Sequence, residues 1–559
     1  MKNKFLYALL AAAVLGLSLG SCSKEGVDGT DPEEPAVPVG EPGYLSFNLT
    51  NAPGTRALEA PDPGTNQENY VGWFWMLLYD TDGKLRYAWE LSADNTDGAT
   101  NFTGSDVATG AHTVTPSPTS FVTKGREILS REYKLAVIAN PDLYATAGML
   151  TSFTGGGGIN SSDPFYNLSG LLAVNAGGYN GNTNEPFING ESTAKPVFMM
   201  TNANGLITVL PANLQKDATE AEKNPVAIQL DRGVAKLMLN ENTTGTPIKT
   251  GGTLVSLEWG LENINKKAYG IRKFTYLGSN IQGLNNYRGD METESNSSPL
   301  REYQYAEDPN FSTYDADDFR NENADPNATG SSKNFVAWNA VNNNTIDEVN
   351  WKYVYENTLD FATQSGSDWA RSTTQIVVNA VITYDFALKD SPATNDYYSW
   401  NAGTDASPKW RVFSHAQLID WMANGYPGEM EDLAALAGYT DNMSVFQSGT
   451  SSFFATDGLS SAKPAVSGAL GMVQDNAREI TFHKGGFNQY RIPIKHFKQQ
   501  FYDNEQDRTG VYGHYGVVRN NVYRVTLNSI NGPGTPTSGW FSASITINPW
   551  QRRGQSEDI

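Results

Sequence analysis

Short apolar segments that alternate with polar residues, separated by Gly- and Pro-rich turns, place the strongest constraint on the fold of this chain. In Tyr44–Leu49, for example, Leu45, Phe47 and Leu49 alternate with polar residues, as a strand with one buried face requires. The chain has 53 glycines, 27 prolines and 27 tyrosines, but few long Leu-, Ala-, Glu- and Lys-rich segments. We therefore predict a mainly β fold with few short helices.

The only cysteine of the chain, Cys22, excludes a disulfide framework and marks an export signal. It directly follows an apolar run, Leu6–Ser21, that opens behind Lys2 and Lys4. This pattern is typical of a signal that is cut before a cysteine, which then carries lipid. The run is shorter than the roughly 20 apolar residues of a transmembrane helix. We predict lipidation at Cys22; an ordinary secretory signal is the alternative.

The charge and the polar residues exclude several classes of function. A formal net charge of −21 argues against nucleic-acid binding, which requires a basic face. The five histidines lack the spacing of metal ligands on one predicted element, and Asp80–Gly83 falls short of a calcium loop. No catalytic motif is present, so we predict no enzymatic activity, no cofactor and no bound metal.

Several elements can be located along the chain. Trp73–Tyr79 and Leu85–Trp89 flank the turn Asp80–Gly83 and are predicted to form a hairpin. Tyr133–Ala139 is predicted to be a buried strand. The one convincing helix is predicted between a capping box, Ser414 with Gln417, and Gly425; its apolar face would carry Leu418, Trp421 and Met422.

Two strands lie apart from the rest, and their flanking segments suggest that they are exchangeable. The first, Tyr44–Leu49, precedes Arg56, which is the first lysine or arginine after Lys24. The second lies within Trp540–Ile547 and follows a Gly- and Pro-rich leash at 531–536, which we expect to be extended or flexible. If cleavage after Arg56 removed the first strand, the exposed backbone edges could accept the second strand of another copy. The alternative is that both strands simply complete their own domains.

Arg288–Asp290 spells Arg-Gly-Asp within a long polar segment, Asn280–Asn350. Some integrins bind this tripeptide, but it also arises by chance in a chain of this length. We make no functional prediction from it.

A set of short motifs, in order along nearly the whole chain, carries a resemblance to a known family. The motifs are the signal ending at Cys22, the first strand with Arg56, Tyr133–Ala139, Asp231–Lys236, Val518–Tyr523 and Ile545–Trp550. With these motifs the chain resembles the type V pilins, the fimbrial shaft subunits of Bacteroidales, and most of all those of the minor fimbriae of Porphyromonas.

The resemblance implies two tandem transthyretin-like β-sandwich domains in a lipoprotein that is exported to the outer membrane. It further implies that an Arg-specific protease removes the N-terminal segment and that strand exchange then builds extracellular fimbriae for adhesion and biofilm formation. The implied segments are a signal peptide at 1–21, a lipidated tether with the removable strand at 22–56, an N-terminal domain at 57–239, a C-terminal domain at 240–530, and the leash with the donor strand at 531–559.

Carried onto this sequence, the resemblance assigns lipidation to Cys22 and proteolytic cleavage to the Arg56–Ala57 bond. The removable strand presents Leu45, Phe47 and Leu49, and the donor strand presents Phe541, Ala543, Ile545 and Ile547. The implied partners are other copies of the chain, anchor and tip fimbrial subunits, an Arg-specific protease, and host or bacterial surface receptors. The alternatives are a fimbrial tip or accessory adhesin, and a surface glycan-binding lipoprotein.

Overall fold

The structure of this chain is a computed structural model. The residues that it describes are 37–51, 68, 70–92, 106, 108, 120–141, 161–162, 164–172, 175–177, 188–189, 197–203, 205–241, 247–265, 267–276, 304–309, 344–345, 351–358, 373–386, 395–401, 409–425, 480–494, 516–534 and 541–549.

Strands dominate the described residues, and they fall into two groups along the chain. The first group comprises β1 (Pro42–Leu45), β2 (Phe47–Asn51), β3 (Trp73–Tyr79), β4 (Leu85–Ser92), β5 (Ser120–Val122), β6 (Arg126–Leu129), β7 (Tyr133–Ala139), β8 (Asn175–Gly177), β9 (Ile188–Asn189), β10 (Val197–Phe198), β11 (Met200–Asn202), β12 (Ile207–Val209) and β13 (Val226–Arg232). The second group comprises β14 (Ala235–Glu241), β15 (Thr253–Glu262), β16 (Lys267–Tyr269), β17 (Lys273–Tyr276), β18 (Gln304–Glu307), β19 (Asn344–Thr345), β20 (Trp351–Val354), β21 (Gln375–Thr383), β22 (Tyr397–Asn401), β23 (Trp410–Phe413), β24 (Ile480–His483), β25 (Phe487–Pro493), β26 (Asn521–Ile530) and β27 (Phe541–Pro549).

The helices of the described residues are few and short. They are α3 (Leu168–Leu172), α4 (Ala218–Lys223) and α6 (His415–Asn424), with 3-10 turns η2 (Pro164–Tyr166), η3 (Pro211–Asn213) and η8 (Lys484–Gly486). The predicted helix is confirmed as α6, since Ser414 and Gln417 form the capping box and Gly425 ends it. None of the helices in the described ranges has the length and apolar character of a membrane span.

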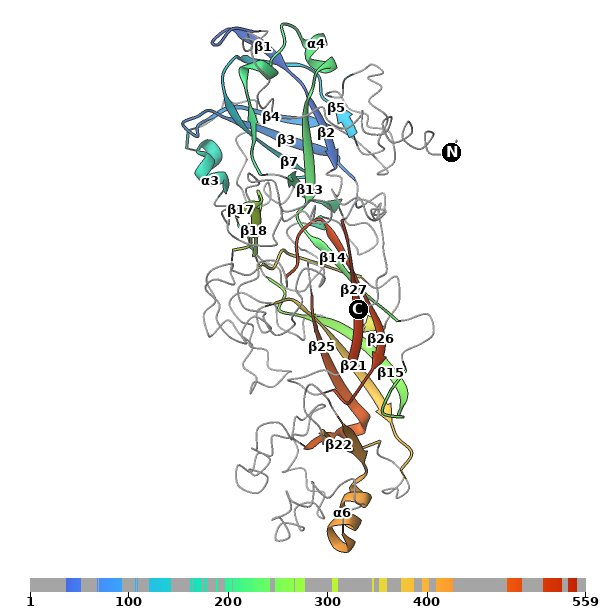
Figure 1. The fold of residues 1–559 in the computed structure, drawn as a ribbon. Helices are drawn as coiled ribbons and strands as arrows, with labels where there is room; N and C mark the ends of the chain where they lie inside the picture. Colours follow the sequence, from blue (N-terminus) through green and yellow to red (C-terminus); the bar gives the residue numbers. More distant parts are fainter. Residues whose placement is uncertain are drawn as a thin grey trace, which may run out of the picture.

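Most strands of the first group build one large sheet at one end of an elongated molecule (Figure 1). Its strand order is β4-β3-β7-β11-β13-β2-β5, with β12 also paired to β7. The predicted hairpin is confirmed, because β3 pairs antiparallel with β4 around a turn that begins at Asp80. Strand β7 is buried throughout most of its length, as its continuous apolar sequence predicts.

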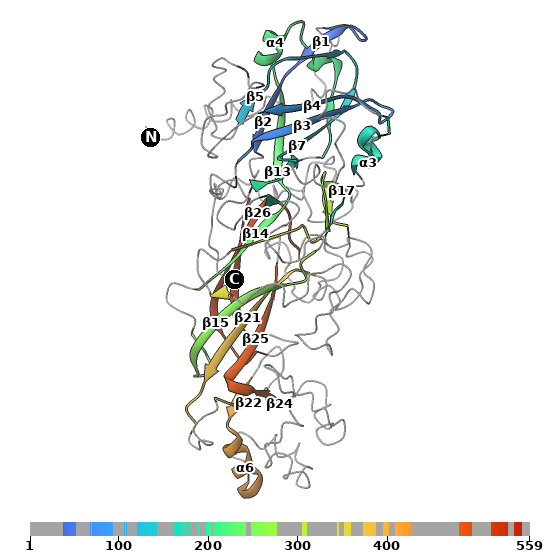
Figure 2. The same ribbon diagram turned by 180° about the vertical axis from the view of Figure 1, so that it is seen from behind.

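Two four-stranded sheets of the second group lie in the other half of the molecule (Figure 2). Their orders are β20-β14-β26-β27 and β19-β15-β21-β25. Buried side chains from both sheets, such as Leu237 and Val525 on one and Trp259 and Val378 on the other, belong to the same hydrophobic cluster. Two sheets that bury their apolar faces together form a β-sandwich, and the predicted mainly β class is confirmed.

The change from one group to the other occurs at Gly233 and Val234, between β13 and β14. Strand β13 belongs to the large N-terminal sheet, whereas β14 lies inside the β20-β14-β26-β27 sheet. The domain boundary expected between residues 239 and 240 falls within β14, and the domain limits stay a prediction. Because the two sheets follow each other through two residues only, their junction leaves little room for independent movement.

Candidate functional site

The N-terminal strand is split in two by Ser46 and is built into the core. Leu45 and Phe47 are 0% exposed and Leu49 is 1% exposed. All three belong to the hydrophobic cluster of the molecule. Burial of such side chains contributes roughly 1.5–3 kcal/mol each, so this segment is a structural member of the sheet.

The position of β2 within the sheet is internal. It pairs in parallel with β13, where Phe47 lies opposite Val226, and antiparallel with β5, where Leu49 lies opposite Phe121. Strand β1 pairs antiparallel with β6. Removal of β1 and β2 would therefore expose a backbone edge on each of these three strands and empty part of the core.

A polar contact lies at the break between β1 and β2. The Ser46 hydroxyl donates a hydrogen bond of 2.6 Å to the backbone oxygen of Thr123, and the Phe47 N–H donates to the Thr123 hydroxyl at 3.0 Å. Ser46 and Thr123 are each 1% exposed. Sequence reasoning did not find Thr123, because it lies 76 residues from Phe47 and no local pattern marks it.

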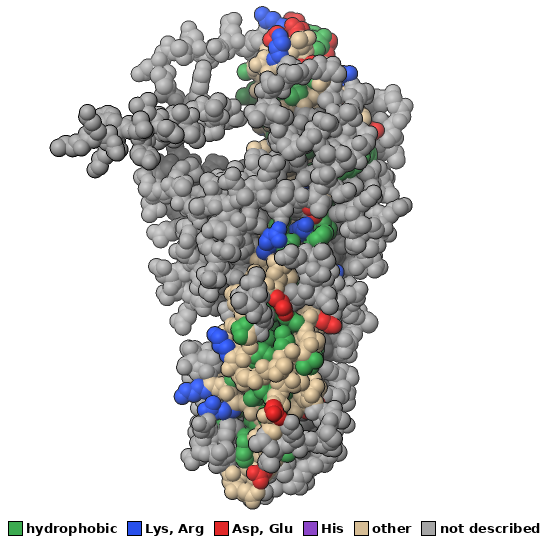
Figure 3. All heavy atoms as spheres, turned by 90° about the vertical axis from the view of Figure 1, so that its right-hand side faces the viewer, with side chains coloured by type: hydrophobic (Ala, Val, Ile, Leu, Met, Phe, Trp, Pro, Cys, Tyr) green, Lys and Arg blue, Asp and Glu red, His purple; other side chains and the backbone are tan. Residues whose placement is uncertain are grey.

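The tip of β1 lies at the surface beside charged residues. The Tyr44 hydroxyl donates a hydrogen bond of 2.9 Å to Glu127, and this contact raises the pKa of Tyr44. On α4, which lies at the same end of the molecule, Lys223 pairs with Glu220. Figure 3 shows acidic and basic side chains intermingled at this end. Such exposed pairs contribute little to stability, so the buried side chains of β1 and β2 dominate the attachment of the segment.

The C-terminal strand lies at the edge of its sheet, in contrast to the internal strand β2. Strand β27 pairs antiparallel with β26 and ends the order of its sheet among the described strands. The four predicted donor residues Phe541, Ala543, Ile545 and Ile547 lie opposite Ile530, Leu527, Val525 and Tyr523. One ladder holds β27, whereas two hold β2, so β27 can leave without separating two neighbouring strands.

The start of the leash is packed against the C-terminal sandwich, which differs from the expectation of a free segment. The Gly534 N–H donates to Asn488 Oδ1 at 3.0 Å, and the Tyr490 hydroxyl donates to the Gly532 oxygen at 3.1 Å. A Cβ atom at Gly534 would lie 2.5 Å from the oxygen of Gln489. Gly534 is thus needed for close approach of the backbone to β25. Residues 535–540 lie outside the described residues.

A buried ionic network, here called the junction cluster, joins the two groups of strands. Its members are Asp231, Arg232, Arg272, Glu356, Arg519 and Asn520, all of them buried. Arg272 Nη1 donates to Asp231 Oδ2 at 2.6 Å, and Arg272 Nη2 lies 3.5 Å from Glu356 Oε1. Arg519 Nε donates to Glu356 Oε2 at 3.1 Å. The carboxylates thus compensate charges that would be expensive to bury alone.

Asn520 connects the two sequence motifs on which the family resemblance partly rests. Its Oδ1 atom accepts a hydrogen bond of 2.9 Å from Arg232, and its Nδ2 atom donates to Asp231 at 2.9 Å. Asn520 has a positive φ of 60°, which asparagine tolerates better than most residues. The motifs Asp231–Lys236 and Val518–Tyr523 therefore meet at the junction although nearly 290 residues separate them.

A second buried ion pair extends the junction toward β20. Lys236 Nζ lies 2.9 Å from Glu68 Oε1, which also accepts a hydrogen bond of 2.6 Å from the Tyr353 hydroxyl. The lysine lies over the ring of Trp351 at 4.1 Å. Burial and the contact with Glu68 raise the pKa of Tyr353, so this hydroxyl remains a donor.

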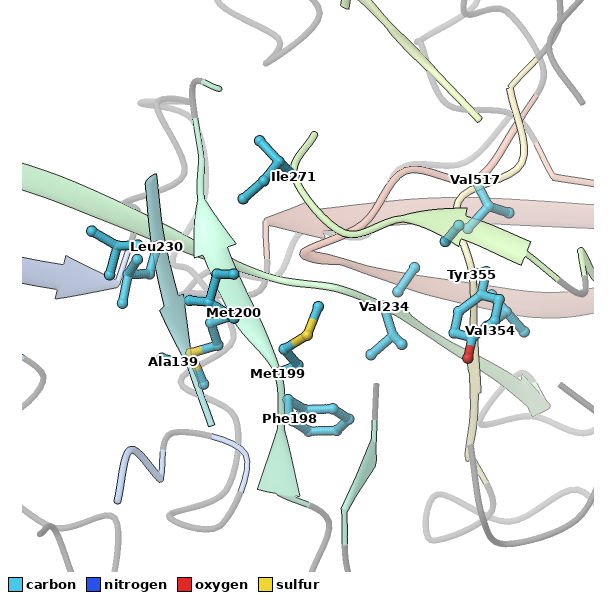
Figure 4. Packing of buried hydrophobic residues seen from close by; sticks show 14 of the residues in the cluster. Ala139, Phe198, Met199, Met200, Leu230, Val234, Ile271, Val354, Tyr355 and Val517 are labelled. Atoms are coloured by element: carbon cyan, nitrogen blue, oxygen red, sulfur yellow. The ribbon is translucent and has the colours of Figure 1, made fainter. Parts of the chain in front are cut away.

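Apolar packing continues through the junction. Met199 lies close to Val234, with Phe198 beside it, while Val354 and Tyr355 approach from the other group of strands (Figure 4). All of these residues belong to the one hydrophobic cluster. Together with the ion pairs, this packing indicates that the two halves are coupled rather than loosely linked.

A buried histidine and serine form a hydrogen-bonded pair that could suggest nucleophilic chemistry. His483 Nε2 lies 2.8 Å from Ser399 Oγ, and His483 Nδ1 lies 2.9 Å from the oxygen of Phe487. Nδ1 must donate to the carbonyl, so Nε2 accepts from the serine hydroxyl. Burial lowers the pKa of His483 to about 4, and both residues are 0% exposed. The pair is therefore a satisfied part of the core, with no access for a substrate.

The remaining sequence candidates either are structural or fall outside the described residues. Asp80 accepts hydrogen bonds from the N–H groups of Asp82 and Lys84, which uses its carboxylate in the turn of the hairpin. No group of acidic, histidine and cysteine side chains with metal-binding geometry occurs in the parts of the chain that the structure describes. Cys22, the Arg56–Ala57 bond and Arg288–Asp290 lie outside those parts.

One known family matches the C-terminal part of the chain. Residues 481–556 match the family described as major fimbrial subunit protein type IV, fimbrillin, C-terminal. The match begins in β24 and extends past β27, so it includes the edge strand. The predicted resemblance to fimbrial subunits is confirmed by this match, which supports a structural, fimbrial or adhesive role at the cell surface.

Solved structures with low sequence identity were also found. A protein of Parabacteroides distasonis proposed to act in cell adhesion has 12% identity and a TM-score of 0.35, with 91% of this chain and 99% of that chain covered. A fimbrial assembly protein of the same species has 10% identity and a TM-score of 0.26, with 92% and 99% covered. The tip fimbrial protein Mfa3 of Porphyromonas gingivalis has 14% identity and a TM-score of 0.26, with 66% and 99% covered. No curated protein matches the chain.

Proposed function

We propose that this chain is a structural pilin subunit that polymerises into surface fimbriae by strand exchange. In this proposal the precursor is exported as a lipoprotein anchored through Cys22 at the outer membrane. An Arg-specific protease then cleaves the Arg56–Ala57 bond. The segment that carries β1 and β2 leaves, and the β27 strand of another copy takes its place.

The single observation that carries the proposal is the internal position of β2, together with the burial of the side chains of β1 and β2. Strand β2 lies between β13 and β5, and Leu45, Phe47 and Leu49 are at most 1% exposed, so the fold depends on this segment. Yet Arg56 follows only five residues after the end of β2, which would place a cleavable bond next to an essential strand. A sheet that lost this strand would need a replacement, and strand addition supplies one.

The edge position of β27 supports the other half of the proposal. Its nine residues, Phe541–Pro549, are close in number to the segment from the start of β1 to the end of β2. Donor and acceptor surfaces differ, so each copy can bind one neighbour at each end. Such heterologous contacts do not close on themselves and produce a filament. Anchor and tip subunits would end the filament, and surface receptors would bind it, with adhesion and biofilm formation as the result.

Digestion with an Arg-specific protease tests this proposal. We expect the purified precursor to be monomeric and the digested protein to form filaments, as seen by electron microscopy and size-exclusion chromatography. The Arg56→Ala variant should stay a stable monomer under the same digestion.

A pair of truncations tests the donor strand. Deletion of residues 540–559 should abolish filaments while the circular dichroism spectrum and thermal melt of the monomer stay nearly unchanged. Deletion of residues 551–559 alone keeps β27 and should leave assembly intact. Filaments from the longer truncation would show that β27 is not the donor.

A further inference from the structure

The break between β1 and β2 places a demand on any strand that replaces them. In the intact chain Thr123 makes three hydrogen bonds to this segment: its backbone oxygen accepts from the Ser46 hydroxyl, its hydroxyl accepts from the Phe47 N–H, and its own N–H donates to the Phe47 oxygen at 2.8 Å. Loss of the segment would leave these buried groups without partners. A replacement must supply a hydroxyl at the Ser46 position, because an unsatisfied buried acceptor is strongly unfavourable.

A second demand comes from Val37, which belongs to the same removable segment. Val37 is 3% exposed, and its side chain would lie 3.0 Å from a Cβ atom placed on Gly43. Leu214, which stays in the protein after cleavage, lies equally close to that position. When the segment leaves, the space of Val37 becomes empty and opens toward the position of Gly43. A donor strand with a large apolar residue at this position would fill it.

The sequence of β27 meets both demands in one register only. Hydroxyl residues occur at positions 542, 544 and 546, so the Ser46 position alone permits three registers. With Ser542 there, Gly539 falls at the Gly43 position and the space of Val37 stays empty. With Thr546 there, Pro549 falls inside the ladder between β13 and β5, where a residue without an N–H is disfavoured.

The remaining register meets both demands, with Ala543 at the Leu45 position. With Ser544 at the position of Ser46, Ile545 and Ile547 take the positions of Phe47 and Leu49. Phe541 then falls at the position of Gly43, where it points into the space that Val37 leaves. The last residue of β27, Pro549, coincides with the last residue of β2.

We propose that the acceptor groove of this protein selects its donor register through two specificity-determining features, the Thr123 polar site and the Val37 pocket, which receive Ser544 and Phe541 of another copy. This inference rests on the proposed strand-exchange function. It adds to that function the partner residue for each feature and the reason for a single register.

Disulfide trapping tests the register directly. Asn48 lies opposite Val122 in the β2–β5 pair, and Thr546 would take the Asn48 position. Directly opposite residues of antiparallel strands are close enough for a disulfide. In a chain with Cys22→Ser, Val122→Cys is combined in turn with Ser544→Cys, Thr546→Cys or Asn548→Cys, and filaments are formed by cleavage after Arg56.

Only the Thr546→Cys variant should give a ladder of linked subunits on a non-reducing gel. A ladder confined to Ser544→Cys or Asn548→Cys would overturn the register while strand exchange itself stands. Filaments with no ladder in any of the three variants would instead show that β27 does not enter this groove, and the proposed function would fail with it.

Matched alanine variants test the polar site. Ser544→Ala removes the hydroxyl that Thr123 requires and should slow assembly about tenfold, the effect expected when a buried acceptor loses its partner. Ser542→Ala is the control, because Ser542 would take the position of the half-buried Tyr44 and its loss should leave the rate unchanged. Equal rates for the two variants would overturn the role of the hydroxyl. Thermal melts of the uncleaved variants would verify that both remain folded.

Discussion

Replacement of Phe47 by alanine should weaken the attachment of the N-terminal segment to the sheet without affecting the assembled fimbria. Phe47 is 0% exposed and lies in β2 between β13 and β5. Replacement of a buried phenylalanine by alanine typically costs about 3–5 kcal/mol, through lost burial and the cavity that remains. We expect Phe47→Ala to lower the free energy of unfolding of the intact chain by that amount.

The effect of Phe47→Ala on assembly depends on the loss of Phe47 together with the N-terminal segment. After the proposed cleavage at Arg56 the segment would be held only by non-covalent contacts, so a loss of about 3 kcal/mol should speed its release more than a hundredfold. If release limits assembly, filaments should form faster by a similar factor. The finished filament would no longer contain Phe47, and its thermal stability should match that of the wild type.

The assay follows the release of a labelled N-terminal segment from the cleaved protein by size-exclusion chromatography. Asn48→Ala is the matched control, because Asn48 is adjacent in β2 but only half-buried, and its release rate should change little. Unchanged release in Phe47→Ala would refute the view that this side chain anchors the strand. Filaments that are as destabilised as the monomer would refute the view that the strand is replaced.

Two further predictions concern the second half of the molecule. Glu356→Gln leaves Arg272 and Arg519 buried with too little negative charge and should lower the free energy of unfolding in urea by about 3–5 kcal/mol. Glu220→Gln breaks an exposed ion pair and should leave the free energy of unfolding nearly unchanged. Equal effects of the two variants would contradict the role of the junction cluster. The pKa of His483 is about 4 in the folded chain and 6.5 when unperturbed, so the unfolded chain binds more protons between these values. The free energy of unfolding should fall by about 1.4 kcal/mol per pH unit as the pH drops from 6.5 to 4. His483→Gln should remove this pH dependence, and an identical pH profile of stability in the variant would contradict the role of His483.

Strand positions were largely predictable because alternation reflects a local property of the backbone. Successive side chains of a strand point to opposite faces, so the burial of Leu45, Phe47 and Leu49 could be anticipated from spacing alone. The break at Ser46 could not, because its cause is a hydrogen bond to a residue 77 positions away. The same limit applies to the leash, where Gly534 suggested freedom but serves close packing against β25.

The junction cluster shows more clearly which features the sequence reveals and which only the folded structure does. The motifs around Asp231 and Arg519 were visible as sequence, whereas Glu356 and Glu68 are single acidic residues among many. Charge has no directional pattern along a chain, so the sequence does not show which of 61 acidic residues will pair with a given arginine. Folding decides this, because burial excludes water and leaves each charge only the partners that the sheets bring within reach.

The sequence by itself determined that this chain forms short strands, that its ends carry two separate alternating segments, and that an arginine follows the first of them. These properties depend on residue type and spacing, which act locally. Only the tertiary structure decided that the first segment lies inside a sheet and the second at an edge. Strand order is set by contacts between residues far apart in the chain, and no local pattern encodes whether a strand has one neighbour or two.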